Sequence, residues 1–128
     1  MVKVVNTPIV PSEAYAGIEI HGSGSVLLHY AVVKEDMCPD GAKSTCHIEY
    51  QEHGDVAGEL EEISDEIKAR WNVEDVAIVR RVGSLNVHDI ISLVAVSSPN
   101  SKDAFEACRY GVGRLKKMTT IIKEEVFR

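Results

Sequence analysis

The sequence has no apolar run long enough to cross a membrane and no excess of positive charge. Spanning a bilayer takes about 20 consecutive apolar residues, and no run approaches that length. Residues 1–15 lack the charged start and apolar stretch of a secretory signal. With 20 acidic against 14 basic residues, the formal net charge is −6, which argues against a surface that coats nucleic acid. These absences predict a cytoplasmic protein with no membrane or nucleic-acid partner.

Cysteine and histidine patterns typical of disulfide frameworks and metal sites are also missing. Cys38, Cys46 and Cys108 form no C-x-x-C pair, which indicates free thiols in a reducing compartment. The five histidines form no H-x-x-H or H-x-x-x-H pair. Cys46 and His47 are neighbours on an expected strand and would point to opposite faces. We therefore expect no metal and no cofactor. A phosphate loop, a G-x-G-x-x-G fingerprint and a nucleophile elbow are absent as well.

The chain is expected to form one domain, residues 1–128, because 45% of its 128 residues are hydrophobic and the length suits a single core. Residues 1–24 carry Pro8 and Pro11 and end in glycines, so we expect an extended segment with a turn. Apolar and β-branched runs predict strands at 25–34, 45–50, 76–82, 89–98 and 119–127, with a loop at 35–44.

Two helices are predicted from apolar residues at helical spacing. The first covers 56–71 with Leu60, Ile63, Ile67 and Trp71 on one face. The second covers about 102–117, capped by Asn100 or Ser101. From residue 45 onward the order is strand, helix, strand, strand, helix, strand, which is a ferredoxin-like split βαβ core preceded by extra N-terminal antiparallel strands. The fold class is therefore α+β, with helices on one face of a mainly antiparallel sheet.

Cations gather near the ends of three expected elements, although the chain is acidic overall. Arg80 and Arg81 lie on one strand, four cations on the second helix and Lys123 on the last strand. Arg109, Gly113 and Lys116 follow at i, i+4 and i+7 and would share one helical stripe, where the glycine leaves room for a bound group. This spacing predicts an anion site. The alternative is a solvated basic face, which we expect for the helix's other two cations, Arg114 and Lys117.

An ordered set of motifs then points to a family. The chain reads R-V-G-S-L at 81–85, V-A-V-S-S at 94–98, A-F-E-A-C at 104–108, L-K at 115–116 and I-K-E-E at 122–125. In order and spacing these segments resemble the large, catalytic subunit of molybdopterin synthase, with its H-R-x-G-x-L, V-x-V-x-S, H-R-x-x-A-F-x-A-C, L-K and P-x-W-K-x-E. The resemblance continues upstream through I-E-Y at 48–50 to residue 24.

The resemblance implies an α/β hammerhead fold, a homodimer within a heterotetramer, and a sulfur-transferase activity. The implied partner is a small ubiquitin-like sulfur-carrier subunit, whose C-terminal Gly-Gly thiocarboxylate enters the active site. The implied substrate is cyclic pyranopterin monophosphate, and two sulfur transfers would form the dithiolene of molybdopterin. By motif match, Lys116 and Lys123 would be the catalytic lysines, Lys116 accepting and returning protons. Arg81 would bind an anion, and Lys34 stands where the family has an arginine.

The chain differs from the family pattern at several positions. Asn100 and Ser101 replace the His-Arg pair before A-F-x-A-C, and Arg80 replaces the histidine of H-R-x-G. We therefore include these three residues and Arg109 among the candidate substrate-binding residues. Two alternatives stay open: a noncatalytic relative that acts as a dimeric binding or regulatory module, and an unrelated ferredoxin-like binder of an acidic small molecule. An enzyme requires Lys116 and Lys123 to face one pocket, whereas a noncatalytic relative predicts a pocket blocked at Asn100 and Ser101.

Overall fold

The computed structural model describes residues 1–35 and 47–126. Most of the loop expected at 35–44, which includes Cys38, lies outside the described residues. Cys46 lies outside them as well. No helix in the described part of the chain is both long and apolar enough to cross a bilayer. In chain order the elements are β1 (Val2–Val5), α1 (Pro11–Gly17), β2 (Ser25–Val32), β3 (His47–Glu52), α2 (Val56–Arg70), β4 (Asp75–Arg81), β5 (Gly83–Leu85), β6 (Ile90–Ser98), α3 (Ser101–Leu115) and β7 (Ile121–Val126).

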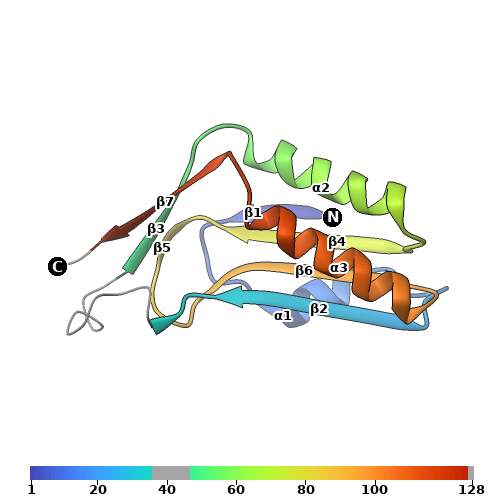
Figure 1. The fold of residues 1–128 in the computed structure, drawn as a ribbon. Helices are drawn as coiled ribbons and strands as arrows, with labels where there is room; N and C mark the ends of the chain where they lie inside the picture. The colour runs from blue at the N-terminus through green and yellow to red at the C-terminus, as the bar shows by residue number, and fades with distance from the viewer. Residues whose placement is uncertain (36–46, 127–128) are drawn as a thin grey trace.

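The larger sheet has the strand order β1-β4-β6-β2 and is covered by helices on both faces. Helices α2 and α3 lie side by side on one face, and the short α1 lies on the other (Figure 1). Along β4 the side chains alternate, since Val76 and Ile78 pack under α2 and α3, whereas Ala77 and Val79 pack against α1. Both faces of the central strands β4 and β6 are thus buried, which explains why apolar residues follow one another along most of their length.

The two long helices begin at side-chain caps. The Asp55 carboxylate accepts a hydrogen bond of 3.0 Å from the Gly58 N–H at the start of α2. The Asn100 side chain accepts one of 2.8 Å from the Asp103 N–H at the start of α3. Each cap satisfies a backbone donor that has no partner within the helix. The prediction that Asn100 or Ser101 caps the second helix is confirmed, with Asn100 as the cap.

A smaller sheet of β5, β3 and β7 stands at the end of the larger one, next to the C-terminal end of α3 (Figure 1). Strand β3 is central and pairs with both neighbours in antiparallel fashion. It carries Ile48 and Tyr50 into a separate core cluster with Leu85 and Ile91. Because β7 is bonded only to β3, the register of this pair decides where the side chains of β7 lie.

The α+β class is confirmed, and both long helices lie where they were expected. Three details differ from the prediction. Residues 1–24 are not merely extended, because β1 pairs in parallel with β4 and Pro11 begins α1, a position where proline costs no hydrogen bond. Residues 83–85, which lie between the predicted strands 76–82 and 89–98, form a further strand, β5. Strands β3 and β7 pair in a second sheet instead of joining β4 and β6.

Candidate functional site

The main pocket of the described chain lies where α3 ends between the two sheets. Its volume is about 540 Å³. The larger sheet supplies one wall, the last turn of α3 a second wall and the smaller sheet a third. The lining residues are His29, Ala31, Val32, Lys34, Tyr50, Arg80, Ile91, Ser92, Val112, Leu115, Lys116, Met118, Ile121 and Lys123. Four residues selected from the sequence are among them: Lys34, Arg80, Lys116 and Lys123.

Three exposed lysines reach this pocket from three different elements. Lys116 is the C-cap of α3, where the negative end of the helix dipole favours a cation. Lys123 lies on β7 directly opposite Tyr50 of β3, so the two side chains share a face of the smaller sheet. Lys34 follows the end of β2. The structure therefore brings the two predicted catalytic lysines to one pocket, although they stand on different elements.

Arg80 contributes a buried cation to the same pocket. It lies on β4 opposite Ser92 of β6, and only 7% of the residue is exposed. Its Cζ lies 4.6 Å from the centroid of the Tyr50 ring, in cation–π geometry. Burial lowers the pKa of the Arg80 guanidinium, and the interaction with Tyr50 opposes this shift. Burial likewise raises the pKa of Tyr50, while the Arg80 charge lowers it.

Arg81 is held away from the pocket. Neighbouring residues of a strand point to opposite faces, and Arg81 is absent from the pocket lining that contains Arg80. Its Nη1 lies 3.4 Å from Oδ2 of Asp89, and its Nη2 donates to the Ser84 carbonyl at 3.3 Å. The charge of Arg81 is thus compensated within the fold, and its contacts hold the β5–β6 connection.

Arg109, the remaining helix cation proposed for the site, lines a separate and more open hollow. This hollow has a volume of about 420 Å³ and also includes Trp71, Tyr110 and Gly113. Lys116 lines the main pocket instead. The structure does not bring the three residues of the predicted anion stripe into one pocket, because Arg109 and Gly113 line this hollow whereas Lys116, the C-cap of α3, lines the main pocket.

Asn100 and Ser101 stand at the opposite end of α3 from Lys116. The helix has 15 residues, and at 1.5 Å per residue it spans about 22 Å. Neither residue lines the main pocket. Within one chain these residues therefore start the helix and do not contact a ligand that lies beside Lys116.

Tyr50 was the main omission from the candidate residues. It is 6% exposed and lies next to Arg80, Lys123 and the pocket. The motif I-E-Y at 48–50 contains it, and alternation along a strand places residues 48 and 50 on the same face. That pattern indicates burial, but only the pairing of β3 with β7 shows that the ring stands beside Lys123.

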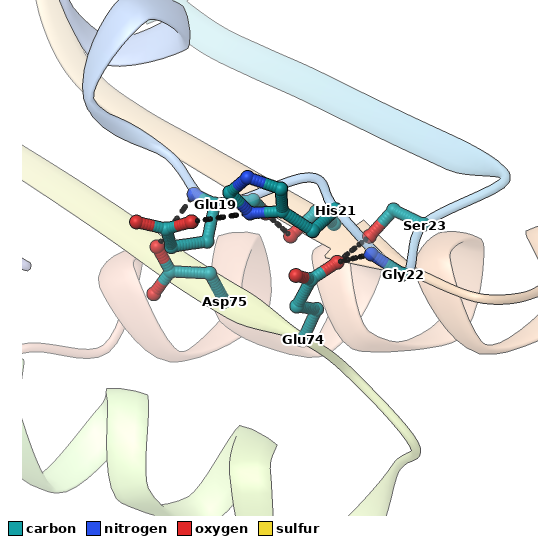
Figure 2. Close-up of polar contacts among 7 residues, drawn as sticks. Glu19, His21, Gly22, Ser23, Glu74 and Asp75 are labelled. Atoms are coloured by element: carbon teal, nitrogen blue, oxygen red, sulfur yellow. Dashed lines mark hydrogen bonds and ion pairs between the residues drawn. The ribbon is translucent and has the colours of Figure 1, made fainter.

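A possible metal-ligating group occurs on the described surface, at the start of β4 (Figure 2). It consists of Glu19, His21 and Glu74. The Glu74 Oε1 already accepts hydrogen bonds from the Gly22 N–H at 2.9 Å and the Ser23 hydroxyl at 2.5 Å. The His21 Nδ1 lies 3.0 Å from the Glu19 Oε2. These contacts attach the turn before β2 to β4, and we assign the group that structural role.

Comparison with known proteins identifies similar sequences and folds. A family model described as "MoaE protein" matches residues 4–118. A molybdopterin synthase catalytic subunit from Staphylococcus aureus (strain COL) is 35% identical over 127 residues, which cover 98% of this chain and 83% of that protein. The crystal structure of molybdopterin synthase from Staphylococcus aureus matches with a TM-score of 0.86 and 32% identity, covering 98% of this chain and 90% of the other.

A more distant structure shares the fold. It is a complex of subunits 1 and 2 of molybdopterin-converting factor from Helicobacter pylori, with a TM-score of 0.72 and 14% identity over 99% of this chain and 85% of that chain.

Proposed function

The chain belongs to the MoaE protein family, and from that premise we propose that it is the catalytic subunit of a molybdopterin synthase. In this function it is a sulfur transferase. Sulfur passes from the C-terminal thiocarboxylate of a small carrier subunit to cyclic pyranopterin monophosphate, and two transfers form the dithiolene of molybdopterin. The chain would act as a homodimer within a heterotetramer.

The observation that carries this proposal is the presence of Lys116 and Lys123 in one pocket. The lysines come from the end of a helix and from a strand of a separate sheet, so helical or strand spacing does not place them together. The sequence analysis expected an enzyme to have both lysines at one pocket, and the two residues meet that requirement.

The chemistry of the reaction explains why cations belong there. A phosphate-bearing substrate and a thiocarboxylate repel each other when they approach, and negative charge develops on the acyl oxygen during the transfer. Cations that are already in position stabilise both the approach and the developing charge. Lys116 would exchange protons with the reacting groups, and Lys123 would act as its electrostatic neighbour. Lys34 would add a third cation at the same opening.

The carrier partner fits the exposed side of the pocket. All three lysines are exposed, so the C-terminal tail of another folded subunit can reach them from solvent. The complex of two converting-factor subunits from Helicobacter pylori has the same fold in one of its chains, which supports a two-subunit assembly.

The noncatalytic alternative predicted a pocket blocked at Asn100 and Ser101. The pocket of about 540 Å³ lies at the other end of α3 and carries both lysines. The replaced His-Arg pair therefore does not close the site within the chain, and this geometry favours the enzyme.

The test is a reconstitution of this protein with a thiocarboxylated carrier subunit and cyclic pyranopterin monophosphate, following molybdopterin as its fluorescent oxidation product. Lys116→Ala and Lys123→Ala should each lower the rate by about 100-fold or more, as expected when a preorganised charge-stabilising group is lost. Lys117→Ala is the matched control, because this exposed lysine is adjacent to Lys116 but lines the other hollow. Absence of product, with a carrier that is competent on an authentic synthase, would overturn the proposal.

A further inference from the structure

The cations of the main pocket differ in depth. Lys34, Lys116 and Lys123 are exposed, whereas Arg80 is 7% exposed and also lines the pocket. The pocket thus has lysines at its opening and one arginine at its floor.

Arg80 has no acidic partner within the described residues. Of residues 1–35 and 47–126, no carboxylate forms an ion pair with it, and its buried Nε has no hydrogen-bond acceptor. The Nε of the neighbouring Arg81 also has no acceptor, but that guanidinium pairs with Asp89 through Nη1 and donates to the Ser84 carbonyl through Nη2. A buried guanidinium is costly to leave without acceptors, so a buried Arg80 that lines a pocket points to an anionic ligand.

Tyr50 orients this guanidinium. The ring packs against it at 4.6 Å from Cζ to centroid. The N–H groups of a guanidinium lie in its own plane, so stacking on one face leaves them available to a ligand. A planar fork of this kind matches the oxygens of a phosphate better than a lysine ammonium does.

The pocket also offers apolar walls beside Arg80, formed by Ile91, Val112, Leu115, Met118 and Ile121. Such walls suit a flat heterocycle next to a charged group. The tail of a protein subunit, which arrives from solvent, meets the exposed lysines before it reaches the floor. The floor therefore fits the phosphate end of a small molecule better than the carboxyl end of a carrier.

We propose that Arg80, supported by Tyr50, binds the phosphate of the pterin substrate at the floor of the pocket and thereby turns the carbons that receive sulfur toward Lys116 and Lys123. This inference rests on the proposed function. It gives Arg80 a specificity role, because the residue selects phosphorylated over unphosphorylated pterins and contacts no sulfur.

The test measures binding without the carrier subunit and without turnover. The probes are a pterin phosphate ester and the same pterin without phosphate, titrated by the anisotropy of pterin fluorescence. Arg80→Gln should weaken binding of the phosphate ester by about 10- to 100-fold, as expected when a hydrogen-bonded charge is removed. The same variant should leave binding of the unphosphorylated pterin within about twofold, since that ligand makes no such bond. Lys117→Gln removes one exposed charge outside the pocket and should change neither affinity.

A second variant keeps the test decisive if Arg80→Gln does not fold. Arg80→Lys retains a cation but not the planar fork, so it should lose affinity for the phosphate ester alone, by a smaller factor. An equal loss for both pterins would mean that Arg80 only supports packing and would overturn the proposal. Unchanged ester binding with weakened carrier binding would assign Arg80 to the carrier and also overturn it. A failed reconstitution with phosphate-selective binding intact would refute only the proposed function.

Discussion

The Thr120 hydroxyl donates a hydrogen bond of 2.6 Å to Oε1 of Glu59, joining the first turn of α2 to the residue before β7. The backbone N–H groups of Thr119 and Thr120 also donate to this carboxylate, at 3.1 Å each. Since β7 carries Lys123 and is bonded otherwise only to β3, Glu59 is a second anchor for the strand that brings this lysine to the pocket.

Replacing Glu59 by glutamine should loosen that anchor. The amide keeps the shape but loses the charge that strengthens these hydrogen bonds, so the free energy of unfolding should fall by about 1 kcal/mol. Synthase turnover should fall with it, because Lys123 loses a fixed position. Glu62→Gln is the matched control, since Glu62 is exposed on the same helix. Urea denaturation and reconstituted turnover measure the two effects. Equal stabilities for the two variants would show that the carboxylate anchors nothing.

The same carboxylate should make stability depend on pH. Burial alone would raise the pKa of Glu59, but the hydrogen bonds from Thr120 and Thr119 outweigh it and lower the pKa below the usual 4.5 of a glutamate. The folded state therefore holds the proton less tightly than the unfolded state, and the stabilisation is complete above the unfolded pKa. It is lost as the pH falls through the lower, folded pKa. The stability difference between wild type and Glu59→Gln should be constant from pH 8 to about 6 and shrink below pH 4.5. A difference that grows in acid would contradict this assignment.

The two glycines of α3 should respond differently to alanine. A Cβ at Gly113 would meet no atom within 4 Å, so Gly113→Ala should gain about 0.5–1 kcal/mol of stability from helix propensity. A Cβ at the buried Gly111 would lie 3.2 Å from Ile67 Cδ1 and 3.3 Å from Val94 Cγ1. These contacts are tighter than van der Waals packing, so Gly111→Ala should gain less than Gly113→Ala or lose stability. Thermal unfolding of both variants measures the difference in stability. Equal gains would show that the Ile67 and Val94 side chains move to make room for a Cβ at Gly111.

These glycines also show what the sequence can and cannot predict. Gly111 stands where the side chains of Ile67 and Val94 pack against α3. Gly113 has open space beside it and lines the hollow that contains Arg109, which agrees with the room that the sequence predicted there. Periodicity locates α2 and α3 well because the apolar spacing is a local property. It does not show which glycine is under a sheet, since that depends on the angle at which the helix packs.

The candidate site was harder to predict from the sequence, because it too depends on how distant parts of the chain pack together. Lys116 and Lys123 were selected by resemblance, and their meeting depends on the pairing of Tyr50 with Lys123 across 73 positions of the chain. Strand alternation predicts that Arg80 and Arg81 point to opposite faces. It does not tell which face borders a pocket, and the assignment of anion binding to Arg81 followed the motif. The ion pair with Asp89 became visible only in the fold.

Cys108 should be an inert thiol in spite of its place in the A-F-E-A-C motif. The residue is 5% exposed and packs in the core between α3 and the larger sheet. Burial raises its pKa to about 11, and only the thiolate is nucleophilic. In a variant with Cys38→Ser and Cys46→Ser, alkylation of the folded protein at pH 8 should run roughly 100-fold or more slower than that of a free thiol. It should reach the free rate in denaturing urea. Cys108→Ala in the same variant leaves no cysteine and gives the background signal of the alkylation assay. Rapid alkylation of the folded variant would show that the site opens to solvent, and Cys108 would then have to be considered as a reactive group.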